Sequence, residues 1–311
     1  MHYWRSKRSG SWDRRYSCLS ATRSAREAPE VLIKARDAEG PDRQDGVEIS
    51  YEHSTSRESE GSDLQKTEVS RACPLGATVS STGTNFSVFS VNATQMEIVF
   101  FDDADASMPA RVIPLDPVLH RTFHYWHIFV PGIKAGKLYG FRADGPNDPQ
   151  NGHRFDSEKL LIDPYGKGIY VGEHYDRDAA GRPGDNAATA MKSVVVDLST
   201  FDWEGDMPLD RPFGGTVIYE MHVAGFTRHP SSGVAGTKAG TYLGLIEKIP
   251  YLQELGVTAV ELMPIFQFDS QAAPPGLTNY WGYSPVSFFA PHQGYSTSKD
   301  PLVCVDEFRL W

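Results

Sequence analysis

The 311-residue sequence has few cysteines and no long apolar run. Its three cysteines, Cys18, Cys73 and Cys304, form no C-x-x-C pair, which excludes a disulfide framework and a zinc or redox site of that pattern. No stretch approaches the ~18 apolar residues of a membrane-spanning helix, so we expect no membrane insertion. A phosphate-binding glycine loop is also missing, because no Lys-Ser/Thr pair follows the glycines at 233 and 236. The sequence therefore predicts no cofactor.

Basic residues are scarce after the first 26 positions. Residues 1–26 hold seven Lys or Arg and one acid, yet the formal net charge of the chain is −10. Nucleic-acid binding needs a basic face, so we expect no nucleic-acid partner. The Arg- and Ser-rich start has the composition of an organelle transit peptide, without a clear amphipathic stripe or the apolar core of a secretory signal. We interpret residues 1–70 as a disordered leader and expect a cytoplasmic protein, with the plastid as the alternative.

Short apolar and aromatic runs alternate with turn signals from about residue 71. The runs NFSVFSV (85–91), MEIVFF (96–101), HYWHIFV (124–130) and LYGFRA (138–143) have the length and spacing of antiparallel strands. In the third run, Trp126, Ile128 and Val130 share one face by the two-residue period, so we expect Trp126 in the core rather than on a binding surface. We predict a β-sandwich over 71–165 and a connecting segment over 166–212, with one short strand at 193–196 that runs over the surface with the rest of the segment.

The pattern changes to alternating strand and helix near residue 216. We expect strands at 217–223 and 259–265, joined by helix from Thr241 to Gly256, which Pro250 kinks or divides into two. A strand, a helix and a second strand with a short return form a βαβ unit, so the two strands should be parallel. Residues 306–311 are predicted to begin another helix.

Several blocks resemble a known enzyme family. YEMHVAGFT (219–227), GTYLGLIEKIPYLQELGVTAVELMPIFQF (240–268) and NYWGYSPVSFFAPHQGYS (279–296) resemble isoamylase-type debranching enzymes, a branch of the alpha-amylase superfamily of glycoside hydrolases. Upstream, YGFRADGP (139–146) and GHRFDSEKLLIDPYGKGI (152–169) are similar to the signature that ends the N-terminal sandwich of that family. The resemblance covers about 71–311.

The resemblance implies a multidomain β plus α/β fold. An immunoglobulin-like β-sandwich of the glucan-binding type would precede an incomplete (β/α)₈ barrel over 213–311. It also implies hydrolysis of α-1,6 branch links in glycogen or starch, with a branched α-glucan as partner. The family's catalytic carboxylates lie on barrel strands four, five and seven, and a barrel takes about 250 residues. We therefore expect no catalytic residue here and an inactive fragment.

The NYWGY segment carries the candidate site residues. By position, Tyr283 matches the family tyrosine that stacks on the sugar at the cleavage subsite, and Tyr280 and Trp281 would line the same opening. Aromatic faces pack well on the C–H faces of sugars. The competing interpretation is that the three rings only pack the loop.

Other polar residues invite weaker interpretations. Glu220 and His222 could line a pocket as a carboxylate–imidazole pair, but one carboxylate cannot supply both roles of a glycosidase, so we favour a buried, hydrogen-bonded polar layer. His124 and His127 would point to opposite faces of a strand, so these two and His120 predict no metal site.

Two further functions stay open. A non-catalytic protein could bind glucan through its sandwich alone, and a glucan branching enzyme has a sandwich and first barrel strands of similar kind. The YGFRADGP and NYWGY blocks favour debranching over branching. The sequence does not separate glycogen from starch and does not indicate an oligomeric state.

Overall fold

The computed structural model describes residues 69–234 and 236–311. The predicted leader, residues 1–70, falls almost entirely outside this part of the chain. Within the described residues, no helix has both the length and the apolar character needed to cross a membrane.

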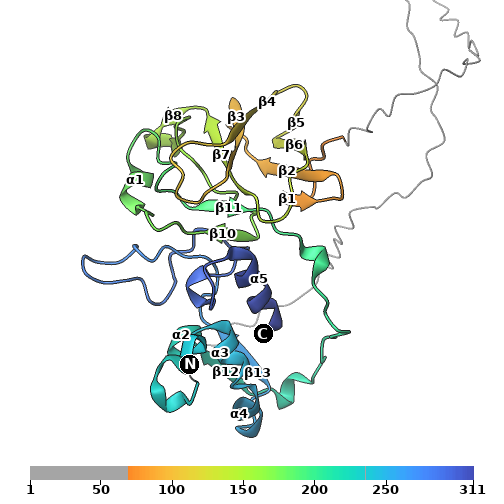
Figure 1. Ribbon diagram of the computed structural model, residues 1–311, viewed down its shortest axis with the longest axis vertical. Helices are drawn as coiled ribbons and strands as arrows, with labels where there is room; N and C mark the ends of the chain where they lie inside the picture. Colours follow the sequence, from red (N-terminus) through yellow and green to blue (C-terminus); the bar gives the residue numbers. More distant parts are fainter. Residues whose placement is uncertain (1–68, 235) are drawn as a thin grey trace, which may run out of the picture. The chain divides into compact units, whose positions relative to one another are not determined.

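The first sheet contains four antiparallel strands in the order β1-β2-β6-β5 (Figure 1). Their bounds are β1 Gly76–Val79, β2 Gly83–Phe89, β5 Arg121–Thr122 and β6 Tyr125–Pro131. Strands β2 and β6 pair over their whole length, from Gly83 opposite Pro131 to Phe89 opposite Tyr125. Two residues, Phe123 and His124, connect β5 to β6 as a tight hairpin turn.

The second sheet contains five strands in the order β10-β11-β7-β3-β4. Their bounds are β3 Gln95–Phe101, β4 Arg111–Leu115, β7 Leu138–Asp144, β10 Gly168–Tyr170 and β11 Lys192–Val194. A two-stranded hairpin, β8 Asn147–Asp148 and β9 His153–Arg154, and the short helix α1 Arg177–Gly181 lie in the connections.

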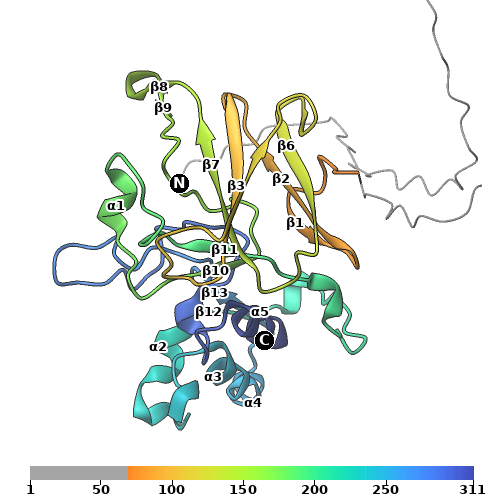
Figure 2. The same ribbon diagram turned by 45° about the horizontal axis from the view of Figure 1, so that its top comes forward.

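The two sheets enclose one apolar core, as the facing strands of Figure 2 indicate. Trp126, Ile98 and Phe100 are fully buried there, which confirms Trp126 as a core residue. Strand β3 is buried on its other face as well, where Val99 and Phe101 pack against Leu160 and residues of the following segment. The unbroken apolar run of β3 follows from this burial on both faces.

The second sheet extends past the predicted end of the sandwich. The four predicted strands are present, and β1 and β4 were not predicted. Beyond residue 165, β10 and β11 pair with each other and β11 pairs with β7, so the first part of 166–212 belongs to the sheet rather than to a surface connection. Ile169 and Val194 are buried by this pairing. The strand predicted at 193–196 overlaps β11, whereas β10 is too short for a two-residue period to reveal it.

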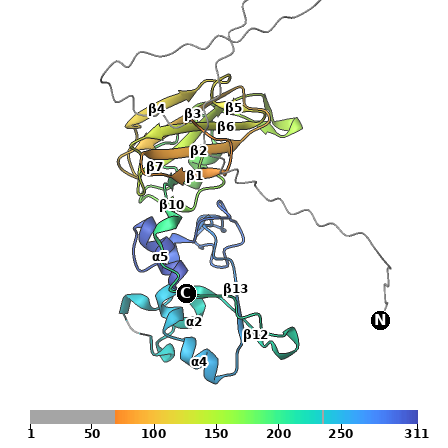
Figure 3. The same ribbon diagram turned by 90° about the vertical axis from the view of Figure 1, so that its right-hand side faces the viewer.

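The C-terminal part forms a parallel βαβ unit, as predicted. Strands β12 Ile218–Met221 and β13 Ala259–Leu262 pair in parallel, with Glu220 opposite Glu261. Helix α2 spans Val223–Arg228 (Figure 3), and Pro250 divides the expected helix into α3 Tyr242–Ile246 and α4 Ile249–Glu254. Helix α5, Pro301–Leu310, begins earlier than predicted because Asp300 caps its first turn. Strands β12 and β13 form a two-stranded sheet of their own, so the incomplete barrel expected over 213–311 stays a prediction.

Candidate functional site

His222 stands directly after β12 and organises the site. It is the N-cap of α2, where its Nδ1 accepts a hydrogen bond of 3.0 Å from the backbone N–H of Gly225. Since Nδ1 accepts, the ring proton is on Nε2, which lies 2.8 Å from the carbonyl oxygen of Tyr280 and 3.1 Å from the hydroxyl of Tyr295. The imidazole therefore fixes the loop after β13 to the end of β12.

Aromatic rings gather around this imidazole. The ring of Tyr280 stacks on it with centroids 4.2 Å apart and planes 13° apart, and Trp281 meets it edge-on at 5.8 Å. Tyr280 and Trp281 also contact each other edge-on at 5.2 Å. Their side chains are 40% and 54% exposed, so both present ring surface to solvent. We call His222, Tyr280, Trp281 and Tyr283 the aromatic site.

Tyr283 lies apart from this ring cluster. Its side chain is 69% exposed, and it has no ring contact among the described residues. Between it and Trp281, Gly282 has a φ of +81°, and a Cβ there would come within 2.9 Å of the Phe268 ring. Only glycine suits this position, and the turn it makes leaves Trp281 and Tyr283 exposed on either side.

His292 and Phe268 form the floor beneath the aromatic site. Their rings stack at 3.6 Å, and Tyr295 packs edge-on against His292 at 4.7 Å. Burial, with a smaller contribution from nearby His222, lowers the pKa of His292 to about 3. Burial also raises the pKa of Tyr295 to about 12. The floor is therefore uncharged at neutral pH, which suits contact with a neutral ligand.

The loop that carries the three predicted rings is anchored at its base. Asp269, 2% exposed, forms an ion pair with Arg177 of α1, and its backbone oxygen accepts a bond from the side chain of Asn279. Asn279 in turn accepts a bond of 3.1 Å from the backbone N–H of Gly282. Sequence reasoning missed Asp269 and Asn279, although a lone acid within the run FQFDS and an asparagine ahead of aromatic residues are signals for such anchors.

Glu220, and Glu261 opposite it on β13, do not form a buried polar layer. Both side chains are exposed, so the buried polar layer expected around Glu220 is wrong for this structure. The strand also ends at Met221, and His222 belongs to the next helix rather than to the same strand face. Asp269 is paired with Arg177. Among the described residues, the aromatic site thus presents ring surface, and its four residues include no carboxylate, whereas glycoside cleavage needs two.

The three histidines of the sandwich, His120, His124 and His127, contact different residues. His127 lies 2.9 Å from both Ser70 Oγ and Thr122 Oγ1, and burial lowers its pKa. Nδ1 of His120 accepts a bond from the backbone N–H of Asp116. Within the described residues, no group of His, Cys, Asp or Glu side chains could hold a metal ion.

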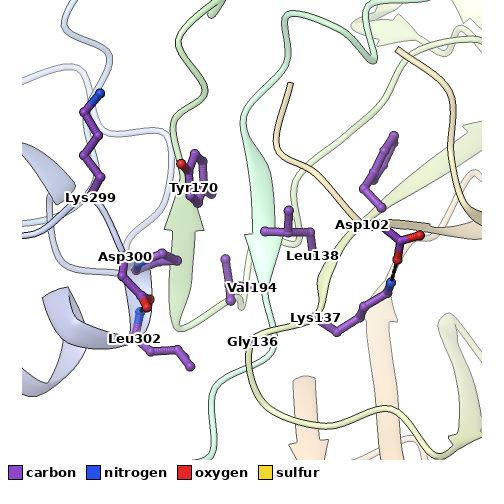
Figure 4. Close-up of a pocket in the computed structure, with 11 residues that line it drawn as sticks. Asp102, Gly136, Lys137, Leu138, Tyr170, Val194, Lys299, Asp300 and Leu302 are labelled. Atoms are coloured by element: carbon purple, nitrogen blue, oxygen red, sulfur yellow. Dashed lines mark hydrogen bonds and ion pairs between the residues drawn. The ribbon is translucent and has the colours of Figure 1, made fainter. Parts of the chain in front are cut away.

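Two cavities lie away from the aromatic site. One, about 420 Å³, lies where β7, β10 and β11 approach the start of α5, and Figure 4 shows the Lys137–Asp102 ion pair in its wall and Tyr170 and Asp300 facing it. The other, about 410 Å³, is an apolar groove that includes Phe266, Phe288 and Phe289. Lys137 forms an ion pair with Asp102, and Lys299 forms one with Glu173. Neither lysine therefore offers an unpaired charge to a ligand in the first cavity.

Comparison with known proteins shows which family this chain resembles. Residues 74–166 match carbohydrate-binding module 48, the isoamylase N-terminal domain. The chain is 41% identical over 228 residues to isoamylase 1, chloroplastic, of Oryza sativa, a match that covers 72% of the chain and 28% of the relative. It is 39% identical over 246 residues to a glycogen debranching enzyme of Yersinia enterocolitica, covering 76% and 36%.

A solved structure matches over a similar range. The apo pullulanase of Paenibacillus barengoltzii is 26% identical, with a TM-score of 0.58, over 77% of this chain and 35% of that one. The chain thus spans about a third of the length of the relatives it matches.

Proposed function

Since residues 74–166 are a carbohydrate-binding module of the isoamylase type, and the chain is related to isoamylase-type debranching enzymes, we propose that it supplies the glucan-recognition part of a hydrolase for α-1,6 branch links. The substrate we propose is a branched α-glucan, glycogen or amylopectin. The relatives' names support this class, because they describe an isoamylase and a glycogen debranching enzyme.

The observation that carries this proposal is the aromatic site at the carboxyl ends of β12 and β13. Loops after the parallel strands form the active face of a (β/α)₈ barrel, so exposed rings at this end are placed to meet a substrate. We propose that Tyr283, Tyr280 and Trp281 contact sugar rings there. The Tyr280 ring packs against His222, and the Trp281 ring packs against both His222 and Tyr280. The rings of Tyr280 and Trp281 are therefore ordered before a ligand binds.

The test uses maltotetraose and residues 1–311. We expect Tyr283→Ala to weaken binding about tenfold, since a lost ring contact is worth about 1 kcal/mol or somewhat more, while Tyr283→Phe keeps the ring and the affinity. Titration calorimetry measures both. Phe213→Ala is the matched control, because Phe213 is also a highly exposed ring, at 86%. Equal affinity of wild type and Tyr283→Ala would remove Tyr283 from the site.

Hydrolysis is tested separately with amylopectin. We expect residues 1–311 to release no linear chains, because the described residues place no pair of free carboxylates at the aromatic site. Reducing-end assays against a boiled control measure this. Clear turnover would mean that acids elsewhere in the chain perform the cleavage. Binding without turnover is also what the alternative function, a non-catalytic glucan-binding protein, predicts for these residues.

A further inference from the structure

The β5–β6 hairpin has an unusual residue at its tip. Phe123 occupies the first position of the two-residue turn with a φ of +57°. Tight hairpin turns need a positive φ at this position to follow the twist of the strands, and glycine, asparagine and aspartate are the residues that supply it. A bulky aromatic residue is a backbone outlier there.

Packing does not explain this choice of residue. The Phe123 side chain is 85% exposed, and its one ring contact among the described residues is with His124, at 6.3 Å. Burial of the ring therefore returns little free energy to offset the strained backbone. A position that breaks a local rule without a gain in packing is where a functional role is expected.

Neighbouring groups hold the turn in this conformation. The Nε of Arg121 donates a hydrogen bond of 2.9 Å to the Phe123 carbonyl oxygen, and the guanidinium lies 4.9 Å from the centre of the buried Trp126 ring. The backbone N–H of Ser90 donates to the carbonyl oxygen of His124 at 2.8 Å. The exposed ring thus projects from a backbone fixed on both sides. Strain maintained in this way is a known feature of ligand-contacting positions.

His124, the ring that Phe123 contacts, connects Phe123 to two further rings. Phe89 and Tyr125 are cross-strand partners with ring centroids 5.3 Å apart, and His124 meets Phe89 at 6.1 Å. Phe89 is 43% exposed and Tyr125 36%. We call these four residues, Phe89, Phe123, His124 and Tyr125, the hairpin cluster. It combines apolar ring surface with an imidazole and a phenol hydroxyl that can hydrogen-bond.

We propose that the hairpin cluster is a second binding surface for an α-glucan chain, separate from the aromatic site, with Phe123 as its principal contact. The proposal rests on the proposed function, because it takes the same polymer as ligand. The cluster lies inside residues 74–166, which match a carbohydrate-binding module. Its rings meet at 60° to 82° and form a curved rather than flat surface, which suits the curved path of an α-linked chain.

The size of the cluster favours a sugar chain over a protein partner. A stable protein interface buries about 800 Å² on each side. At about 200 Å² for each ring, the exposed fractions of Phe123, Phe89 and Tyr125 leave about 330 Å² in all, which is well below that area. A few glucose units fit such a surface. Two separate contacts on one branched polymer also raise the overall affinity without any new interaction, because the second contact forms within the same complex.

The test compares variants of residues 1–311 by electrophoresis in gels with and without glycogen. We expect Phe123→Gly and Phe123→Asn to weaken glycogen retention at least about tenfold, while Phe123→Trp and the control Phe213→Ala behave as wild type. Thermal unfolding of Phe123→Gly should occur at the wild-type temperature or a few degrees above it, because glycine relieves the strained turn. A purely structural role for Phe123 predicts the opposite shift.

The outcomes separate the two proposals. Retention of wild type with equal retention of Phe123→Gly and Phe123→Asn overturns the second surface and leaves the proposed function standing. Failure of the wild-type chain to bind glycogen or maltotetraose defeats the proposed function as well. Equal weakening of glycogen retention by Phe123→Gly and Phe213→Ala overturns the second surface. A change in the self-association of Phe123→Gly in sedimentation, with glycogen retention unchanged, also overturns the second surface. A Phe123→Gly variant that binds maltotetraose at the aromatic site normally but binds glycogen poorly supports the second surface.

Discussion

Asp163 is a carboxyl group buried within the sandwich. It accepts hydrogen bonds of 2.8 Å from the Tyr139 hydroxyl and from the backbone N–H of Tyr165. Burial nevertheless dominates and raises the pKa of Asp163 to about 6, while burial and the neighbouring carboxylate raise that of Tyr139. Folding therefore favours the protonated acid over the charged one. The family signature DPYGKG includes this residue, but a sequence cannot show that its carboxyl group is withdrawn from water.

The pH dependence of stability follows from this raised pKa. Asp163 lowers the free energy of unfolding least below its unfolded pKa of about 4. This destabilisation grows as the pH rises to about 6, where it reaches about 3 kcal/mol. Asp163→Asn cannot ionise, so its free energy of unfolding relative to wild type should increase between pH 4 and pH 7. Urea unfolding at several pH values measures this difference. Asp206→Asn, at an exposed position, should show no such trend, and a flat difference for Asp163→Asn would contradict the prediction.

At the scale of the single element, helix α3 depends on its N-terminal cap, Thr241. The Oγ1 atom of Thr241 accepts a bond of 3.3 Å from the backbone N–H of Gly244 and donates one of 2.8 Å to the carbonyl oxygen of Lys238. A helix of five residues has few other bonds to hold its first turn. The cap is therefore a large part of what keeps this helix formed.

Loss of the cap should be measurable in α3 alone. Thr241→Ala should cost about 1 kcal/mol and speed amide exchange at Gly244 about fivefold, whereas Thr241→Ser keeps the hydroxyl and the slow exchange. Hydrogen exchange followed by NMR reports the individual amides. Equal exchange rates in the two variants would show that packing, rather than the hydroxyl, holds this turn.

Elements with a clear period were predictable from the sequence. Strands β2, β3, β6 and β7 followed from their apolar runs, and Thr241, Pro250 and Gly256 correctly marked the limits and the division of the helical segment. The short strand predicted at 193–196 corresponds to β11, whereas β10 was missed because three residues carry no period. The contact of Tyr280 and Trp281 with His222 could not be predicted, because it depends on how a long loop folds back. Contact of these rings with sugar stays a prediction.

The two parts of the whole molecule respond differently to acid. In the C-terminal part, the pKa of His292 is lowered to about 3, so its neutral form supports the fold at high pH and that support is lost as the pH falls below about 6.5. In the sandwich, the lowered pKa of His127 acts in the same direction, but Asp163 acts in the opposite one. Strand β12 also carries an exposed apolar side chain, Ile218 at 54%, and the apolar side chains of β13 are only partly buried.

We therefore expect acid to loosen residues 213–311 before the sandwich. Hydrogen exchange, corrected for intrinsic rates, should show weaker protection of β12 and β13 than of β2, β3 and β6 at pH 7, and a wider gap at pH 5. In His292→Gln, which cannot gain a proton, the gap should change little between the two pH values. Similar protection of both parts at pH 5 in the wild-type chain would contradict the prediction.

The anchoring of the loop that bears the aromatic site has a practical consequence for dividing the chain into separate parts. Its base is tied by Asp269 to Arg177, by Gln271 to the backbone of Arg177 and Tyr175, and by Gln293 to the backbone of Val171, all in the stretch that follows the matched module. A cut at residue 166 keeps these tethers with the C-terminal part but removes β10 and β11 from the sheet that they complete, whereas a cut near residue 212 keeps the sheet and removes the tethers. Chimeras that exchange either part alone between relatives should therefore lose stability at whichever border is chosen.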